Sequence, residues 1–175
     1  MELIFETYKV TLVDNKDNTC KVRISPNKGE ALKAERRKLY VISCGDQILY
    51  IGEANTSIKT RFQRGCTSFN FYIKNDKTRG GYKGYKWLNK VHNSERDLKV
   101  SVVIFPKEYD EDEKREFIEA IEGELVYLIR QKTDKWPLFQ NEIHFHNHAE
   151  SKEIAEIILK NGFHSEIMAI CQFSA

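Results

Sequence analysis

The chain has 175 residues, of which 41% are hydrophobic and 31% are charged, and its formal net charge is only +2. This composition is typical of a globular protein and excludes an intrinsically disordered chain. The length suits one domain with a sizeable core. So small a net charge gives no global sign of nucleic-acid binding, although a local basic face stays compatible with it.

The cysteines and the N-terminus indicate the cellular compartment. Cys20, Cys44, Cys66 and Cys171 are far apart and form no C-x-x-C pair. We interpret them as reduced thiols rather than as a disulfide framework or a zinc site. The N-terminus lacks the apolar region of a signal peptide, and no apolar run approaches the roughly 20 residues of a membrane helix. The sequence therefore predicts a cytoplasmic protein without a membrane partner.

Two pairs of strands are predicted in the first third of the chain. Residues 6–25 read as two strands joined by a polar turn at Asp14–Asn18, followed by a loop at Ser25–Glu30. A short helix is compatible with the sequence EALKAERRK that comes next. Strands Lys38–Ser43 and Gln47–Ile51 then form a tight hairpin.

Helices dominate the prediction for the remainder of the chain. The spacing of apolar residues predicts a helix over Thr56–Arg64. A buried strand, Leu98–Phe105, precedes the longest helical pattern, Glu111–Gln131. A final helix is predicted over Ser151–Lys160, where an Asn-Gly pair suits its C-terminal end.

Two tyrosines stand ten positions apart in the predicted hairpin. Tyr40 occurs in KLYVI and Tyr50 in LYIG, and a basic helix with Arg61 follows at once. Taken alone, either tyrosine is a common strand residue whose usual role is packing. Farther along the chain, Glu124 opens an apolar helical run and Asn141 follows WPLFQ. The ordered set is more informative than any one of its members.

In this order the five residues resemble the GIY-YIG nuclease family. Members of that family include homing endonucleases, some restriction enzymes and the incision subunit of nucleotide excision repair. The resemblance covers Lys38 to Asn147, about two thirds of the chain, with the YIG element intact at Tyr50-Ile51-Gly52. The first element reads K-L-Y, so that Lys38 stands where the family's glycine usually sits.

The resemblance implies hydrolysis of a phosphodiester bond with one divalent ion, Mg²⁺ or Mn²⁺, held by Glu124. Arg61 would hold a non-bridging phosphate oxygen, because its planar fork of donors suits phosphate. Tyr50 would act as the general base, and Tyr40 would orient the attacking water. Asn141 would hold the end of the helix and its loop against the site.

Neighbouring residues leave parts of this assignment open. Glu122 competes with Glu124, from which it differs by two positions and so lies roughly on the opposite side of a helix. Arg64 competes with Arg61, one helical turn earlier. Many family members carry a histidine or tyrosine four residues after the arginine, where this chain has Gly65, and this departure shifts more of the general-base role to the YIG tyrosine.

Two further features bring additional candidate ligands. Glu53 follows YIG directly, and we interpret it as a solvated turn residue, with assistance to the metal ion as the alternative. In HFHNH, His144, His146 and His148 fall on one face of an extended segment, a spacing that can bind zinc or another transition metal. We interpret the first two histidines instead as part of the strand or loop after Asn141, near the DNA.

A basic and aromatic segment, KNDKTRGGYKGYKW, is the predicted DNA-binding surface. Its cationic side chains can contact phosphates, its aromatic rings can stack, and its glycines let the backbone approach a duplex closely. A flexible solvated loop is the alternative interpretation. The candidate nucleic-acid-binding residues are Arg64, Arg79, Lys83, Tyr85 and Lys86.

We therefore predict an α+β fold in which a small, mainly antiparallel sheet is flanked by helices. Residues 1–36 would form an N-terminal extension (a hairpin and a short helix), residues 37–147 the nuclease core and residues 148–175 a C-terminal helical extension, all in one compact unit. The predicted function is that of a divalent-metal-dependent endonuclease acting on double-stranded DNA, with a restriction-type role and a homodimer left open. The rival hypotheses are a nucleic-acid-binding module with this fold but no turnover and a histidine-rich metal-binding protein.

Overall fold

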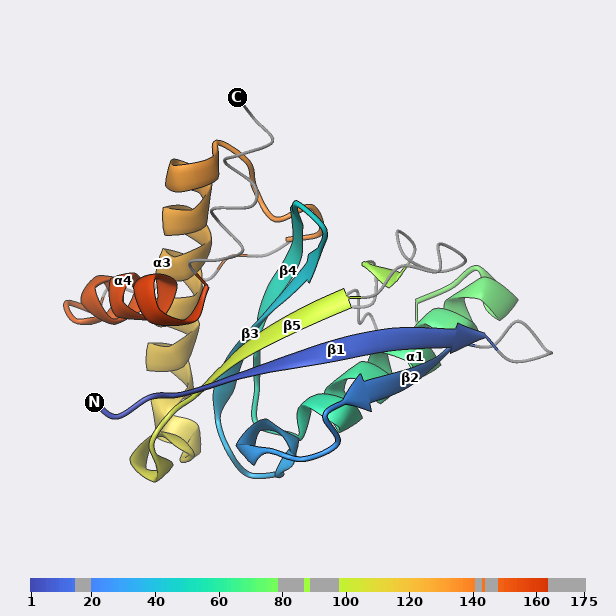
Figure 1. Cartoon of the computed structure of the whole chain (residues 1–175), viewed down its shortest axis with the longest axis horizontal. Helices are drawn as coiled ribbons and strands as arrows, with labels where there is room; N and C mark the ends of the chain where they lie inside the picture. The colour runs from blue at the N-terminus through green and yellow to red at the C-terminus, as the bar shows by residue number, and fades with distance from the viewer. Residues whose placement is uncertain (15–19, 79–86, 89–97, 141–142, 144–147, 164–175) are drawn as a thin grey trace.

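The computed structural model describes residues 1–14, 20–78, 87–88, 98–140, 143 and 148–163. Within these residues, five strands form one sheet in the order β2-β1-β5-β3-β4, and every neighbouring pair is antiparallel (Figure 1). The strands are β1 (Ile4–Asp14), β2 (Cys20–Ser25), β3 (Lys38–Cys44), β4 (Gln47–Ala54) and β5 (Leu98–Ile104). The predicted α+β fold with an antiparallel sheet is confirmed.

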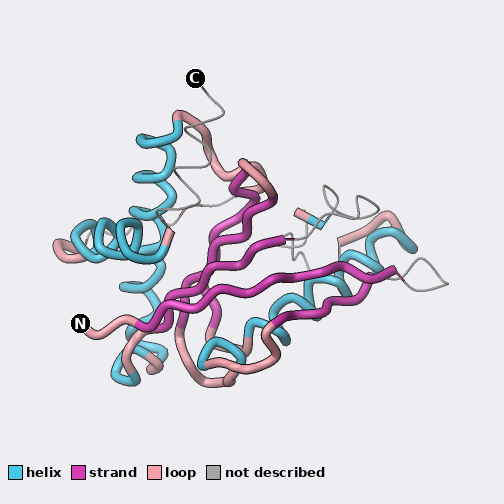
Figure 2. The backbone as a smooth tube through the Cα atoms, in the orientation of Figure 1, coloured by secondary structure: helices cyan, strands magenta, loops and turns pink. Residues whose placement is uncertain are grey.

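Helices cover both faces of this sheet. The described helices are α1 (Ile58–Asn75), α3 (Arg115–Thr133) and α4 (Ser151–Gly162). Helix α1 runs along β1 and β2, whereas α3 and α4 pack together on the other side of the strands (Figures 1 and 2). No helix in the described part of the chain is both long and apolar enough to cross a membrane.

Two hydrophobic clusters follow from the alternation of side chains along the central strands. In β3, Tyr40 and Ile42 belong to the cluster beneath α1, whereas Leu39 and Val41 belong to the cluster beneath α3 and α4. All residues of β3 are buried, as expected for a strand covered on both faces. The sheet therefore separates the two cores, and residues next to each other in a strand serve different helices.

The predicted N-terminal and C-terminal extensions share these cores. Strand β1 pairs with the whole length of β5, from Ile4 opposite Ile104 to Val10 opposite Leu98. The N-terminal hairpin is therefore part of the central sheet. Helix α4 contributes Ile158 and other apolar residues to the same cluster as α3. The extensions are thus integral to the packing of the described residues.

The helix predicted from EALKAERRK is only a short 3-10 turn, Glu30–Leu32. In a continuing α-helix, the carbonyls of Ala31 and Lys33 would accept hydrogen bonds from residues four positions later. Here both carbonyls accept from Lys38 Nζ instead, at 3.5 Å and 2.9 Å. The later amide of Glu35 donates to Asn55 O at 3.0 Å. Contacts across the fold therefore replace the local helical hydrogen bonds.

Helix α1 is twice as long as predicted, because its apolar face continues beyond Arg64 through Cys66 and Phe69. It begins at Ser57, whose side chain accepts a hydrogen bond from the Thr60 amide at 3.0 Å. Its end at Asp76, which has a left-handed backbone, lies within the segment predicted as a basic loop.

Lys38, the first residue of β3, is fully buried. Besides the carbonyls of Ala31 and Lys33, its ammonium group donates to Thr56 O at 3.0 Å, just before α1. Burial lowers the pKa of Lys38 to about 8, against the opposing effect of the Asp110 carboxylate. Lys38 thus ties the first strand of the hairpin to the chain segments on both of its sides.

We expect the burial of Lys38 to give the protein a specific pH dependence of stability. Since its pKa of about 8 in the folded state lies below the ordinary 10.5, the folded state binds fewer protons between these values. The cost of burying the charge is fully present below pH 8 and disappears as the pH rises toward 10.5. Between pH 7 and 10, the free energy of unfolding of the wild type should rise relative to Lys38→Met by about 2–3 kcal/mol. Urea unfolding of both proteins at each pH measures the difference, and a constant difference would contradict the expectation.

Candidate functional site

The two tyrosines of the predicted motif lie together over Gly52. Tyr40 in β3 is directly opposite Gly52 in β4, and the ring centroids of Tyr40 and Tyr50 are 6.1 Å apart. A Cβ atom at Gly52 would lie 2.8 Å from Tyr40 Oη and 2.6 Å from Tyr50 Cε1, which is closer than side chains tolerate. The glycine of YIG is therefore needed so that both phenol rings can occupy this place.

Arg61 reaches the same place from the second turn of α1. Its Nε donates a hydrogen bond to Tyr40 Oη at 3.2 Å. Arg64, the alternative considered from the sequence, is exposed on the helix. The structure thus brings Arg61 to the tyrosines. Tyr50 and Arg61 both keep part of their surface exposed, so the cluster is open to solvent.

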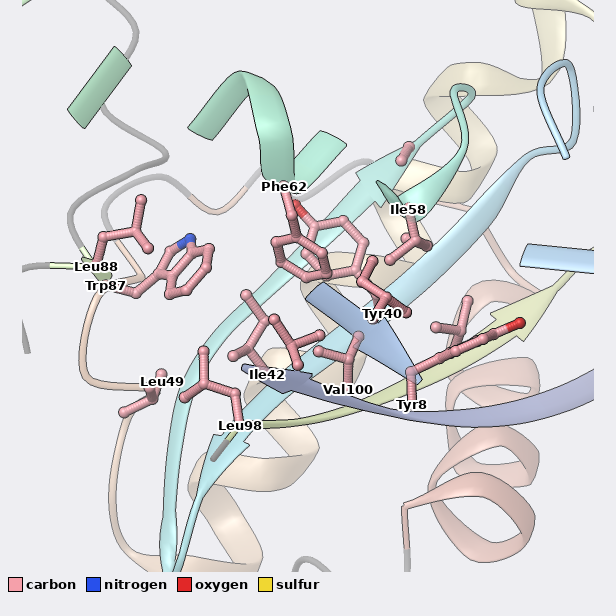
Figure 3. Packing of buried hydrophobic residues seen from close by; sticks show 14 of the residues in the cluster. Tyr8, Tyr40, Ile42, Leu49, Ile58, Phe62, Trp87, Leu88, Leu98 and Val100 are labelled. Carbon is pink, nitrogen blue, oxygen red and sulfur yellow. The ribbon is translucent and has the colours of Figure 1, made fainter. Parts of the chain in front are cut away.

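Aromatic packing fixes the direction of α1 over the sheet. Phe62, the neighbour of Arg61, lies edge-on between Tyr40 and Trp87, at centroid distances of 5.8 Å and 5.4 Å (Figure 3). Ile58 packs in the same cluster one turn earlier. Because Phe62 is buried, the preceding side chain is directed to the edge of this core, where it meets the phenol of Tyr40.

Glu53 points to the other face of β4, and its environment differs from the prediction. Its side chain is only 14% exposed, and its carboxylate pairs with Arg37 Nη1 at 2.8 Å. Burial raises the pKa of Glu53, while the guanidinium groups of Arg37 and Arg115 act in the opposite direction. The interpretation of Glu53 as a solvated turn residue is therefore wrong, because helix α3 and Arg37 cover this face of the strand.

Arg37 is a residue that the sequence analysis missed. It is buried, and its guanidinium donates to the carbonyls of Tyr109 and Glu111, at 3.0 Å and 3.3 Å, as well as to Glu53. Its own amide donates to Asp110 Oδ1 at 2.6 Å. Arg37 thus fixes both Glu53 and the connection that leads into α3. A basic residue just before an apolar strand gave no sign of this role.

Glu122 on α3 lies near enough to Arg61 for the guanidinium to affect its pKa. Its carboxylate accepts a hydrogen bond from the backbone amide of Glu53. Burial, and after it the carboxylates of Glu53 and Glu119, raises the pKa of Glu122 to about 8, while Arg61 acts in the opposite direction. Glu122 is partly exposed. It therefore lies where α1, β4 and α3 meet, among groups that disfavour its negative charge.

Glu124, the metal ligand expected from the sequence, lies elsewhere on α3. Two positions along a helix correspond to a difference of about 160° in direction, so Glu124 does not share the orientation of Glu122. Glu124 forms no side-chain hydrogen bond or ion pair with another residue of the described part of the chain. Its role stays a prediction, and Glu122, the competitor noted from the sequence, is the carboxylate coupled to Arg61.

The segment after α3 runs along the outer edge of β4. The amides of Leu138 and Phe139 donate to Ile48 O and Leu49 O at 3.0 Å and 2.8 Å, and Gln140 Oε1 accepts from the Ile51 amide at 3.1 Å. This segment leads directly into Asn141. The predicted residues that lie outside the described part of the chain are Arg79, Lys83, Tyr85, Lys86, Asn141, His144 and His146.

The described residues contain no group of three or more His, Cys, Asp or Glu side chains arranged to hold a metal ion. His148 is exposed, and its ring lies edge-on to Phe117 at a centroid distance of 5.4 Å. The carboxylates of Glu53 and Glu122 remain as two neighbouring groups whose oxygens can bind a metal ion at the edge of the sheet. Magnesium often binds through only one or two carboxylates and completes its shell with water and phosphate oxygens.

Comparisons of this chain with family models, with curated proteins and with solved structures gave no match. The functional inference therefore depends on the side chains and their arrangement, together with the ordered motif in the sequence.

Two glycine substitutions should have opposite effects on stability. Gly52→Ala should lower the free energy of unfolding by about 1–3 kcal/mol, because the new Cβ displaces both phenol rings. Gly65→Ala in α1 should raise it by about 0.5–1 kcal/mol, because among the described residues its Cβ would meet only Leu88 Cδ1, at 3.9 Å, and alanine favours the helix. Urea unfolding of the two variants tests the geometry of the site, and a Gly52→Ala variant as stable as the wild type would contradict it.

Proposed function

We propose that this protein is a divalent-metal-dependent endonuclease that hydrolyses the phosphodiester bonds of double-stranded DNA. The observations that carry the proposal are three: Tyr40 and Tyr50 lie over Gly52, Arg61 donates to Tyr40, and Glu122 accepts from the amide of Glu53, the residue after Gly52 in β4. These groups come from four different elements, β3, β4, α1 and α3. Tyr40 is buried, whereas Tyr50, Arg61 and Glu122 are partly exposed. Two phenols, a guanidinium and a carboxylate can provide proton transfer, anion binding and metal binding.

Arg61 is suited to bind the phosphate that is cleaved. Its guanidinium has five N–H donors in a planar fork, and the hydrogen bond to Tyr40 fixes the position of this fork. Arg64, which is exposed one turn later on α1, extends the cationic surface toward the neighbouring phosphates of a duplex.

The tyrosines are suited to handle the attacking water. Tyr40, whose Oη accepts the hydrogen bond from Arg61, is the candidate for orienting this water. Tyr50 is partly exposed beside it and is the candidate general base. Gly52 leaves room for the two phenol rings side by side, 6.1 Å apart. Catalysis by proximity depends on such fixed positions of the reacting groups.

Glu122 is the principal candidate ligand of the divalent ion, and Glu53 is the second. Their carboxylates lie where burial and mutual repulsion oppose negative charge, and a cation would offset both effects. Glu53 also forms an ion pair with Arg37, so Glu122 is the more available metal ligand. When bound, Mg²⁺ or Mn²⁺ would stabilise the charge of the transition state and of the leaving oxygen.

Replacing each glutamate in turn distinguishes the two assignments of the metal ligand. Glu122→Gln should lower the rate of plasmid cleavage in Mg²⁺ by about 10²–10³ or more, because the charged ligand is lost. Its amide oxygen can still accept the hydrogen bond from Glu53, so the fold should persist. Glu124→Gln is the matched control on the same helix and should cleave like the wild type.

The cleavage assay should include a chelator arm, a DNA-binding measurement and the unfolding curve of each variant. Cleavage by the wild type should stop when EDTA is added, and DNA binding by Glu122→Gln should persist. If Glu124→Gln loses cleavage and Glu122→Gln retains it, the ligand assignment from the sequence is correct. Binding without cleavage by the wild type in Mg²⁺ and Mn²⁺ would instead support the alternative of a binding module without turnover.

Divalent ions should also stabilise the folded protein in the absence of DNA. At 100 times the dissociation constant, a bound ion contributes about 2.7 kcal/mol, which corresponds to a rise in Tm of roughly 5–10 °C. Glu122→Gln should lose most of this rise, whereas Glu124→Gln should keep it. Thermal unfolding with increasing Mn²⁺ measures the effect, and equal shifts in both variants would place the ion elsewhere.

A further inference from the structure

Cys20 and Cys66 form a thiol pair in the core between β2 and α1. Their Sγ atoms are 2.9 Å apart, and both residues are completely inaccessible to solvent. They are 46 positions apart in the chain. Cys44, at the end of β3, is the other cysteine in the described residues, and none of the three is in a disulfide. The prediction of reduced cysteines stands for these three, of which two are neighbours, while Cys171 lies outside the described residues.

A side-chain amide holds the backbone of Cys20 against α1. Asn70 Oδ1 accepts from the Cys20 amide at 2.9 Å, and Asn70 Nδ2 donates to the Cys20 carbonyl at 3.1 Å. Asn70 lies one helical turn after Cys66, so both hydrogen bonds come from the helix that carries the partner thiol. The pair is therefore positioned by contacts that are independent of the sulfur atoms.

The separation of the sulfur atoms is close to that of a covalent bond. A disulfide has an S–S length of about 2.05 Å, so that a movement of roughly 0.9 Å would join the two atoms. Both thiols lie in the apolar cluster beneath α1, with Ile24 and Phe69 among its members. The elements that carry the pair, β2 and α1, already pack against each other.

We propose that Cys20 and Cys66 are a redox-modifiable dithiol site that closes to an intramolecular disulfide in the presence of a small disulfide oxidant such as oxidised glutathione. Because both thiols are inaccessible in the closed fold, the reaction requires a local opening between β2 and α1. One protein thiolate then attacks the oxidant and releases one small thiol. The second protein thiolate then attacks the mixed disulfide and releases the other. In total, the protein thiols lose two hydrogen atoms and the oxidant is reduced to two thiols.

The bond would join the N-terminal hairpin to the helix that carries Arg61. A cross-link over 46 positions restricts the unfolded chain and so stabilises the folded state. Cys66 is five positions after Arg61 on α1, but the modification does not depend on the proposed nuclease activity, and it can be tested without DNA.

The variant Cys44→Ser/Cys171→Ser retains only Cys20 and Cys66 and isolates the site. After incubation of the folded variant with oxidised glutathione, we expect the loss of both free thiols and a peptide map that contains the Cys20–Cys66 link. The Tm should rise by roughly 5–15 °C and return to its initial value after reduction. The same linked peptide should appear in the oxidised wild type, which checks that the substitutions have not created it.

Adding Cys66→Ser to this variant provides the control, in which glutathione should produce no intramolecular link and no rise in Tm. The proposal would be overturned if the folded protein kept both thiols under conditions that oxidise the urea-unfolded chain. Oxidation that stops at a glutathione adduct, produces linked dimers, pairs other cysteines in the wild type or lowers the Tm would also overturn it.

Discussion

The candidate site depends on the absence of a side chain at Gly52. Hydrogen on this Cα lets the phenols of Tyr40 and Tyr50 approach the backbone of β4 more closely than any Cβ would allow. Tyr40 in this position receives the hydrogen bond from Arg61, and the register of β3 and β4 places it there. The close contact between β3 and β4 at Gly52 therefore determines where these two strands and α1 present Tyr40, Tyr50 and Arg61.

The position of β4 at the edge of the sheet has an equally direct effect. An edge strand has backbone groups that no further strand can satisfy. In this protein, the amide of Ile51 binds Gln140, and the amide of Glu53 binds Glu122. The carboxylate of α3 is thus held by the backbone of the same strand that presents Tyr50 and Gly52. The same contacts of β4 therefore cover the edge of the sheet and hold the carboxylate of the site in place.

The sequence predicted the strands and the main helices because their apolar spacing is a local property, and it identified Arg61 and both tyrosines through an ordered motif. It could not predict Glu53 or Arg37, because their burial depends on which helix covers a strand face. Glu122 was partly predictable: it lies four positions after Ile118 and three before Leu125, within the apolar stripe of α3. The helix predicted before β3 was reduced to a 3-10 turn because tertiary contacts, such as those of Lys38, replaced local hydrogen bonds.

The strand order also has a consequence for how the chain folds. Strand β1 lies inside the sheet, and its first residue, Ile4, pairs with Ile104, the last residue of β5. During synthesis, the hairpin of β1 and β2, which is complete at Ser25, must therefore wait for β5, which begins at Leu98, before its open side finds a partner. Such distant pairing carries a large loop-closure entropy and slows folding. Until β5 emerges, the edges of β1 and β3 that it later joins are unpaired and open to association with other chains.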